Sequence, residues 1–398
     1  MGDTYHNMAS NSPAPSMPPE QPASGVAEHR AKQPLQARKA FVEDYEQIAA
    51  LHLRNGLTLR SRDDWMAFWL QNPVYRERPQ SPIGWVLETE SHGIVGWIGN
   101  IPSLYQFRGR RLCAATPWSW MVDVQHRGYG LLILKRFLRQ RDIDLFVCNN
   151  ISSVSDPFAR HLRFSRVPVG AWHKSAFWIT NYPGFAQIAL RMKSVPMARA
   201  VSYPVSVALA CWDWCNDGWI RDRSSITDIE PCSEFDSRFD DFWDELQRQN
   251  ENVLLAVRTR ETLAWHFRNA LMHQSLWILT TRKGSRLTAY AIFDKQDNPR
   301  IGLKRIRLVD FQAHRGSEAA LLSALSWMLH KCREDGIHML EVSGCWLDRP
   351  QLPRIVAPYH RTMPSWSYYY KVLDPKLSAE LRDPRVWAPS SFDGDASL

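Results

Sequence analysis

The sequence has few of the features that mark metalloproteins, disulfide-stabilised proteins or serine hydrolases. It contains seven cysteines in 398 residues, and no two of them form a C-x-x-C pair, which argues against a disulfide framework or a zinc site. Cys211 and Cys215 are four residues apart without nearby histidines, a pattern typical of small buried apolar side chains. The 13 histidines are scattered, and neither H-E-x-x-H nor G-x-S-x-G occurs. We therefore expect no metal site and no serine-hydrolase chemistry.

Long apolar runs are also missing. The longest, residues 205–212, is too short to span a bilayer, and the start lacks the charged and apolar regions of a signal peptide. We therefore expect a soluble, cytoplasmic protein without a membrane span. Residues 185–219 mix basic and apolar positions; a helix between domains is the favoured interpretation, and an amphipathic helix on an anionic membrane surface is the alternative.

The composition predicts a folded protein with flexible ends. Hydrophobic residues make up 44% and aromatic residues 12% of the chain, which is typical of globular proteins, and the length suffices for two domains. Residues 1–36 are rich in proline, serine and alanine, and residues 377–398 also lack apolar periodicity. We expect a disordered leader at the first of these segments and a flexible tail at the second.

Positive charge is concentrated in one window of the chain. The chain carries a net charge of +8, and residues 107–141 contain eight basic residues against the single acid Asp123, a local charge of +7. The basic residues are Arg108, Arg110, Arg111, Arg127, Lys135, Arg136, Arg139 and Arg141. Such a window indicates either a solvated surface or a funnel for a polyanionic ligand. Because no nucleic-acid-binding motif is present, we expect no nucleic acid as partner.

A glycine-containing segment lies inside this basic window. Residues 125–130 read Gln-His-Arg-Gly-Tyr-Gly; they follow an apolar run at 118–124 and precede a helical pattern at 131–138. A strand, a turn and a helix in this order form a cradle for phosphate, because the N–H groups at the helix start point outward and the helix dipole adds positive charge. Gly128 and Gly130 would let a phosphate approach the backbone without a Cβ in the way.

The spacing Q-x-x-G-x-G resembles the acyl-CoA pyrophosphate motif of the GNAT-type N-acetyltransferase superfamily. The order of elements predicted for residues 38–182 resembles the GNAT fold, with the glycine turn after the fourth strand. It consists of a strand, two helices, three strands, a helix, a strand, a helix and closing strands at 167–179. A similar order recurs at an offset near 190 residues and closes with a strand at 366–372. We therefore expect an α/β (α+β) fold of two GNAT-like domains in tandem, each a mixed, largely antiparallel sheet flanked by helices.

The resemblance divides the chain into domains of unequal function. Residues 37–182 are expected to form an acyl-CoA-binding GNAT-like domain, 183–224 a connector, and 225–376 a degenerate GNAT-like domain. In the second half Gln312 and Gly316 keep the position of the motif, but Ser317 and Glu318 follow, and a carboxylate there would repel a pyrophosphate. We expect this half to bind no CoA and instead to shape the acceptor cleft or to support a homodimer.

The resemblance implies an acyl-CoA-dependent N-acyltransferase, with acetyl-CoA or another acyl-CoA as co-substrate. The implied acceptor is an amine on an amino sugar, a cell-envelope precursor, a small molecule or a protein. Residues implied to line the pantetheine and thioester are Met121, Val122 and Val124. Residues implied to hold the pyrophosphate are Gln125, His126, Arg127, Gly128, Tyr129, Gly130 and Leu131. Either Asn149 or Asn150, at the end of the fifth strand, is implied to contact the pantetheine arm.

The catalytic groups are harder to assign. The position where the family often carries a proton-donating tyrosine holds Ala159, and the fourth strand has Thr116, Trp118 and Trp120 where a carboxylate often stands. Three other residues remain as candidates for acid–base catalysis, namely Asp123, His126 and His161. The alternative to an enzyme is a catalytically silent acyl-CoA-binding or scaffold protein.

Overall fold

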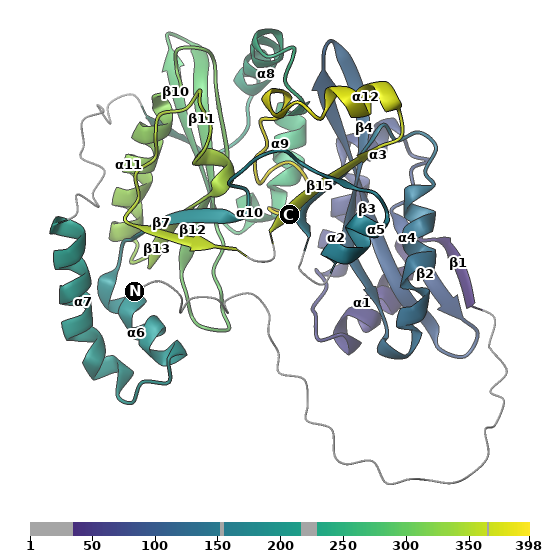
Figure 1. The fold of residues 1–398 in the computed structure, drawn as a ribbon, viewed down its shortest axis with the longest axis horizontal. Coiled ribbons are helices and arrows are strands. Elements are labelled where there is room, and N and C mark those ends of the chain that lie inside the picture. Colours follow the sequence, from purple (N-terminus) through teal and green to yellow (C-terminus); the bar gives the residue numbers. More distant parts are fainter. Residues whose placement is uncertain (1–34, 152–154, 216–228, 364–365) are drawn as a thin grey trace. The chain divides into compact units, whose positions relative to one another are not determined.

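The computed structural model describes residues 35–151, 155–215, 229–363 and 366–398 (Figure 1). The chain forms two compact units. The first comprises Met1–Met66, Ser81–Asn100 and Pro117–Arg141, and the second comprises Ala67–Gln80, Ile101–Thr116 and Asp142–Leu398. Most of the expected leader lies outside the described residues.

The elements up to residue 141 follow the predicted order closely. They are β1 (Leu35–Lys39), α1 (Tyr45–Arg54), α2 (Arg62–Leu70), α3 (Pro73–Glu77), β2 (Gly84–Thr89), β3 (Gly93–Phe107), β4 (Arg110–Val122) and α4 (Gly130–Leu138), with short 3-10 helices at Val42–Asp44 and Val124–Tyr129. β1, β2 and β3 pair antiparallel in succession. Helix α4 buries Ile133, Leu134 and Phe137, and Phe137 meets Trp85 of β2 edge-on at 5.8 Å between ring centroids.

The rest of the chain adds helices and a second sheet. Its helices are α5 (Asp156–His161), α6 (Tyr182–Met192), α7 (Ala198–Cys215), α8 (Arg238–Gln249), α9 (Arg260–His266), α10 (Arg268–Met272), α11 (Ala320–Glu334) and α12 (Pro375–Glu380), with 3-10 helices at Gly344–Trp346 and Pro384–Val386. Its strands are β5 (Leu145–Ile151), β6 (Ser165–Arg166), β7 (Lys174–Ile179), β8 (Glu230–Cys232), β9 (Leu255–Ala256), β10 (Leu276–Lys283), β11 (Arg286–Lys295), β12 (Arg305–Ala313), β13 (Met339–Ser343), β14 (Tyr359–Thr362) and β15 (Ser367–Val372).

The described strands form two mixed sheets, each of which contains a parallel pair of strands. The hydrogen-bonded orders are β1-β2-β3-β4-β5-β15-β6, with β9 added to β3, and β14-β7-β13-β12-β11-β10-β8. The parallel pairs are β4 with β5, through Ala114 and Leu145 among others, and β12 with β13, through Leu308 and Val342 at the far end of the ladder. Each parallel pair is connected through a helix, α4 in one case and α11 in the other (Figure 1), as a parallel crossover requires.

Two strands lie in the opposite sheet from the one predicted. We expected residues 167–179 to close the first sheet, but β7 pairs with β13 in the second, Ala176 opposite Val342. We expected residues 366–372 to close the second sheet, but β15 pairs with β5 in the first, Tyr370 opposite Val147. Both predictions of the strand partner are wrong, because periodicity indicates that a segment is a strand but does not specify which edge supplies its hydrogen bonds.

The core of the second sheet follows directly from helical spacing. Helix α8 buries Phe239, Phe242, Trp243 and Leu246, which recur at i, i+3, i+4 and i+7 and so form one apolar stripe. Helix α11 packs against β11, β12 and β13 (Figure 1). Helix and strand residues of this part join one large apolar cluster.

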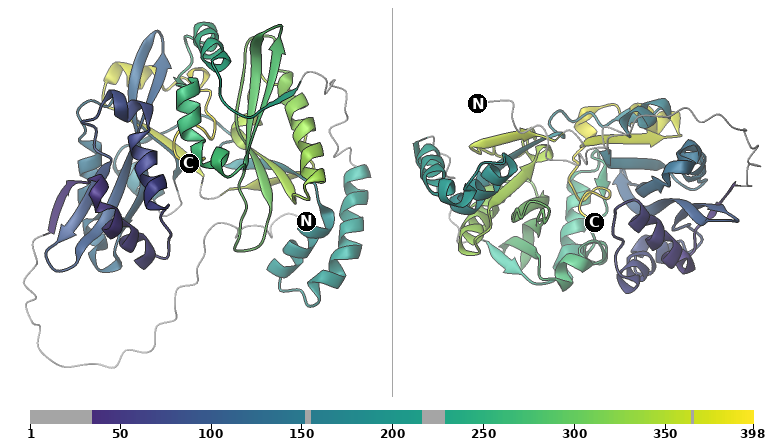
Figure 2. Two further views of the ribbon diagram at one scale, coloured as in Figure 1. Left: turned by 180° about the vertical axis from the view of Figure 1, so that it is seen from behind. Right: turned by 90° about the horizontal axis from the view of Figure 1, so that it is seen from below.

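The expected connector contains two helices that pack side by side, α6 and α7 (Figure 2); its residues 216–224 lie outside the described part. The carboxylate of Asp213 is buried and accepts hydrogen bonds from the hydroxyls of Tyr182 at 2.8 Å and Tyr359 at 2.7 Å. Cys211 and Cys215 are exposed on α7, so the expectation that they are buried is wrong. No helix among the described residues is both long enough and apolar enough to cross a bilayer.

The segment expected to be a flexible tail is instead folded against the core. After α12 it buries Trp387, Ser390, Phe392 and Asp393. The prediction failed because the segment has no periodicity of its own; it is held by apolar contacts and by buried polar partners that lie far away in the sequence.

Candidate active site

The glycine segment forms a tight turn between a strand and a helix. β4 ends at Val122, Val124–Tyr129 form a 3-10 helix, and α4 begins at Gly130. The amide of His126 donates to the carbonyl of Asp123 at 2.8 Å, and this bond closes the first turn. The predicted sequence of strand, turn and helix is therefore present at this position.

The two glycines of the turn have different surroundings. A Cβ on Gly128 would meet no atom within 4 Å, whereas a Cβ on Gly130 would lie 3.4 Å from the Trp120 ring and 3.7 Å from Val122. Gly130 therefore lets α4 pack closely against β4. Gly128 faces open space, which fits the approach of a phosphate group to the backbone.

Basic side chains remain available around the turn. Arg127, Lys135, Arg136 and Arg139 are exposed, and none of them has an acidic partner within the described part of the chain. The acid of this window, Asp123, is neutralised by other groups. These four cations therefore favour a polyanionic ligand.

Asp123 is engaged in holding the turn to α1. Its Oδ2 accepts from Arg54 at 2.9 Å and its Oδ1 from the Asn55 amide at 3.1 Å. An open recess with a volume of about 540 Å³ is lined by Arg54, His92, Asp123, Val124 and Gln125. Asp123 thus serves the shape and charge balance of the turn.

The two candidate histidines lie in different units. The His126 ring is half-buried, 6.1 Å from the His92 ring, and its Nδ1 is enclosed without a hydrogen-bond partner among the described residues. His161 is exposed as the last residue of α5. Within the described part of the chain, neither has a bonded carboxylate that would orient it as a general base.

The end of β5 carries the two asparagines. Asn149 is fully buried, its Oδ1 accepts from the backbone amide of Asp395 at 3.3 Å, and its Nδ2 has no hydrogen-bond partner within the described ranges. Asn150 is exposed, and its side chain hydrogen-bonds the Asp395 carboxylate. Gly394 packs so closely that a Cβ there would lie 2.7 Å from the Asn149 amide carbon. The C-terminal segment therefore lies against the end of β5.

Asp395 is a titratable group that sequence reasoning missed. Its Oδ1 is enclosed without a hydrogen-bond partner among the described residues. Burial raises the pKa of Asp395 to about 6, although the bond from Asn150 opposes this shift. The residue has no motif around it, and only the folded C-terminal segment brings it to β5.

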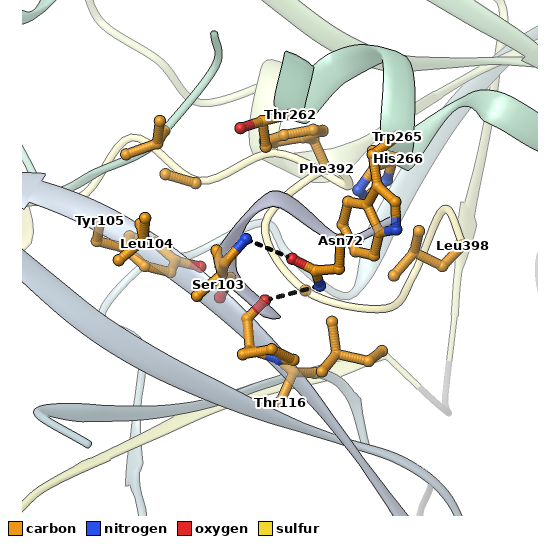
Figure 3. A pocket seen from close by; sticks show the side chains of 16 residues that line it. Asn72, Ser103, Leu104, Tyr105, Thr116, Thr262, Trp265, His266, Phe392 and Leu398 are labelled. Carbon is orange, nitrogen blue, oxygen red and sulfur yellow. Dashed lines mark hydrogen bonds between the residues drawn. The ribbon is translucent and has the colours of Figure 1, made fainter. Parts of the chain in front are cut away.

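A small pocket adjoins this segment in the second unit. It is lined by Asn72, Val74, Ile101, Pro102, Ser103, Leu104, Tyr105, Thr116, Ala256, Val257, Thr262, Trp265, His266, Phe392, Gly394 and Leu398. Figure 3 shows Ser103 and Thr116 on the strand side and the aromatic rings of Trp265 and His266 on the other. The cavity volume is about 30 Å³, enough for one or two water-sized groups.

Solved structures with a similar fold come from several organisms. A GCN5-related N-acetyltransferase from Anabaena variabilis matches with a TM-score of 0.53 and 13% identity, over 86% of this chain and 73% of that one. A probable N-acyltransferase from Enterococcus faecalis matches with a TM-score of 0.52 and 10% identity, over 85% and 73%. N-myristoyltransferase from Saccharomyces cerevisiae, solved with myristoyl-CoA and inhibitors, matches with a TM-score of 0.50 and 10% identity, over 95% and 88%.

The chain has a GNAT-type fold. The two mixed sheets flanked by helices are consistent with two GNAT-like domains in tandem, so the predicted fold class is confirmed. No family model and no curated protein matches the sequence. Within the described residues, no group of three or more histidine, cysteine or acidic side chains is arranged to hold a metal ion.

The second GNAT-like half fills the turn after its fourth strand with its own side chains. Beyond β12 the His314 ring stacks on Phe242 of α8 with centroids 4.2 Å apart. The backbone amide of Arg315 donates to the side chain of Gln249 at 2.9 Å. Gln312 is buried and donates to Asp310 at 3.1 Å. That this half binds no CoA stays a prediction.

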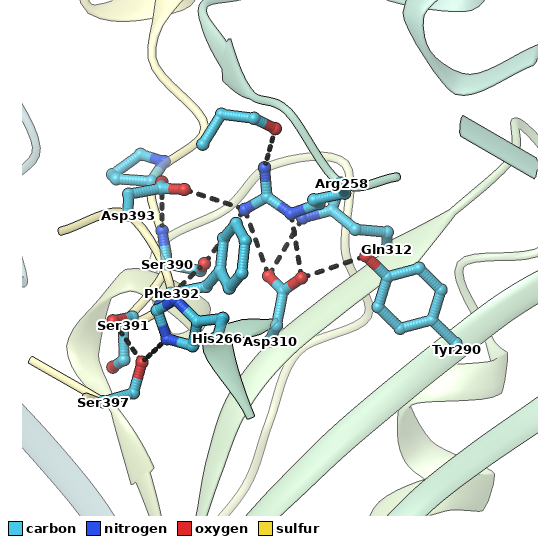
Figure 4. A network of polar contacts seen from close by, with 12 residues as sticks. Arg258, His266, Tyr290, Asp310, Gln312, Ser390, Ser391, Phe392, Asp393 and Ser397 are labelled. Atoms are coloured by element: carbon cyan, nitrogen blue, oxygen red, sulfur yellow. Dashed lines mark hydrogen bonds and ion pairs between the residues drawn. The ribbon is translucent and has the colours of Figure 1, made fainter. Parts of the chain in front are cut away.

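A buried arginine anchors the C-terminal segment of the GNAT-type fold (Figure 4). Arg258, only 1% exposed, donates to Asp310 of β12 through Nε at 2.8 Å and to Asp393 through Nη2 at 2.9 Å. It also donates to the Ala256 carbonyl at 2.7 Å and to the Ser390 hydroxyl at 3.1 Å. The arginine thus ties β12, the chain after β9 and the C-terminal segment together.

The charges in this network are unevenly stabilised. Burial alone would raise the pKa of Asp310, but the charge of Arg258 and bonds from Arg258, Ser390 and Gln312 lower it. Burial and the neighbouring Asp310 raise the pKa of Asp393 against the pull of Arg258. One guanidinium shared by two carboxylates explains why only one of them is strongly held in the charged form.

Proposed function

We propose that this protein is an acyl-CoA-dependent N-acyltransferase. The observation that carries the proposal is the open turn at Gly128, which follows the fourth strand of a GNAT-type fold and is flanked by cations that have no acidic partner among the described residues. Acetyl-CoA is the proposed donor and the cytoplasm the proposed compartment.

The proposed roles of the cofactor-binding residues follow the direction of the chain. Met121, Val122 and Val124 line the pantetheine and thioester, and the backbone of residues 125–131 holds the pyrophosphate. Arg127 and the basic side chains of α4 add positive charge beside the turn. Asn149, whose Nδ2 has no hydrogen-bond partner among the described residues, is the proposed contact for the pantetheine arm.

In the proposed reaction, the amine nitrogen attacks the thioester carbonyl carbon, the new C–N bond forms, and the C–S bond breaks. The amine gives up one proton and the departing CoA thiolate takes up one, so the overall step consumes none. Asp395 is the proposed base for the amine proton, because it is a carboxylate with an enclosed, unbonded oxygen and a pKa of about 6. Asp123 is a weaker candidate because both of its oxygens are engaged.

The competing function is a catalytically silent acyl-CoA-binding protein. The observation in its favour is that the family's tyrosine position is occupied by Ala159, which is buried in α5. An assay for free CoA thiol with acetyl-CoA and a panel of amines separates the two. Thiol release that depends on the amine supports the enzyme, and binding without release for every amine class supports the silent protein.

The cofactor site is tested by calorimetry with acetyl-CoA on the full chain. Gly128→Ala adds only a methyl group where nothing lies within 4 Å, so we expect normal folding but at least tenfold weaker binding, about 1.4 kcal/mol. Gly128→Glu adds negative charge and should weaken binding further. Gly170→Ala is the matched control, because Gly170 is exposed and a Cβ there meets only Asp348 at 3.7 Å. Equal binding by wild type and both Gly128 variants would contradict the proposed site.

A further inference from the structure

The pocket of Figure 3 contains hydroxyl groups that nothing in the folded chain uses. Thr116 is fully buried and Tyr105 is 2% exposed. The hydroxyl oxygens of Ser103 and Thr116 are enclosed, and neither has a hydrogen-bond partner among the described residues, whereas the Tyr105 hydroxyl is paired with that of Tyr368. Enclosed hydroxyls without partners cost free energy, so this cluster is explained best by a ligand that bonds to them.

The walls of the pocket restrict the charge of that ligand. No lysine, arginine, aspartate or glutamate is among the lining side chains, so nothing is present to neutralise a phosphate or a carboxylate. The rings of Trp265, His266 and Phe392 line it instead, and the faces of aromatic rings attract cations. A ligand group that carries several N–H donors and is either neutral or positively charged suits such walls.

The polar side chain beside these hydroxyls is already committed to the fold. Asn72 donates to the Pro102 carbonyl at 3.2 Å, and its Oδ1 accepts from the Val74 amide at 2.9 Å at the start of α3. Asn72 therefore fixes the position of the neighbouring β3 backbone. The hydroxyls of Ser103 and Thr116 remain available to a ligand.

We propose that this pocket binds the head of the acyl acceptor, a primary amine on an uncharged, unbranched stem. The two hydroxyl oxygens can accept the N–H groups of an amine or ammonium, and the aromatic walls contact the methylene group next to it. The small cavity admits such a head and no ring or phosphate. Gly394, which lines the pocket, directly precedes Asp395, so the amine is held beside the proposed base. This inference rests on the proposed N-acyltransferase function and narrows its acceptors to non-phosphorylated amines.

The test measures equilibrium binding to the full chain without acyl-CoA, by calorimetry, for n-butylamine, butyrate and O-phosphoethanolamine. We expect only n-butylamine to bind. The double variant Ser103→Ala/Thr116→Val should weaken its binding at least tenfold. Because the Thr116 hydroxyl has no partner, the isosteric valine should leave thermal stability unchanged or raise it. Thr281→Val is the matched control, on strand β10 away from the pocket lining.

The outcomes separate this inference from the proposed function. Binding of n-butylamine that the double variant loses supports the pocket, even if no acyl transfer is found and the proposed function fails. Acylation of n-butylamine with an unchanged KM in the double variant overturns the pocket while the function stands. Failure of the wild type to bind n-butylamine, or equal binding of O-phosphoethanolamine, also overturns it.

Discussion

Replacing Arg258 by methionine should lower the free energy of unfolding far more than replacing an exposed arginine does. Arg258 is 1% exposed and serves two carboxylates, Asp310 at 2.8 Å and Asp393 at 2.9 Å. Methionine fills much of the same volume but leaves both acids buried without a cation. Removing one partner of a buried ion pair costs about 3–5 kcal/mol.

The measurement is urea unfolding of the full chain. With an m-value of about 3–4 kcal/mol per molar, as the size of the chain suggests, the midpoint should fall by about 1 M. Arg300→Met is the control, because Arg300 is exposed and has no acidic partner within the described ranges; its effect should stay within about 0.5 kcal/mol.

The pH dependence of this destabilisation tests whether the two unpaired carboxylates cause it. Without the guanidinium, the folded-state pKa values of Asp310 and Asp393 should rise above their unfolded values. A carboxyl group whose pKa is higher in the folded than in the unfolded state favours folding at low pH, and this contribution is lost as the pH rises through the folded-state pKa. The destabilisation by Arg258→Met should therefore be largest at pH 7 and smaller at pH 5. A cost below about 1 kcal/mol, or an equal cost at both pH values, would refute this account of the network.

Three further predictions follow from single sites. Asp395→Asn should remove the rising limb, centred near pH 6, from the pH dependence of amine acylation, and an unchanged limb would exclude Asp395 as the base. Glu341 is 1% exposed among Arg305, Arg307 and Arg361, so Glu341→Gln should lower the free energy of unfolding by about 3–5 kcal/mol at pH 7. These arginines lower the pKa of Glu341 against the effect of burial, so the stability difference between wild type and variant, measured by denaturant titration, should shrink below about pH 4. Iodoacetamide at neutral pH should label the exposed Cys211 and Cys215 before Cys345, since burial raises the pKa of Cys345 to about 12; mass spectrometry with early labelling of Cys345 would contradict this.

Local pattern was enough to predict most elements of this fold and the position of the glycine turn. The apolar spacing of Phe239, Phe242, Trp243 and Leu246 lies within one helix, and such a pattern can be read without knowing what it packs against. The same holds for β4, the turn at Gly128 and α4, which are contiguous in the chain. The functional roles of these turn residues remain predictions.

Groups that act together from distant parts of the chain could not be found in this way. Asp395 comes to β5 because apolar contacts and the bond from Arg258 to Asp393 anchor the segment that carries it. The pocket likewise combines Thr116 of β4 with Trp265 of α9. No local signal links such residues, because long-range burial and not short-range periodicity brings them together.

The sequence by itself determined the order of strands, helices and turns, since hydrophobic periodicity and turn residues are local properties of a chain, and the resemblance of that order to the GNAT fold implied the fold class. Only the tertiary structure decided that β7 belongs to the second sheet and β15 to the first, because a strand offers the same backbone donors and acceptors to any edge that meets it. It also decided that the C-terminal segment is folded. Asp393 of this segment is held by Arg258, more than a hundred residues away, and the energy of such a buried pair depends on where the chain places both partners.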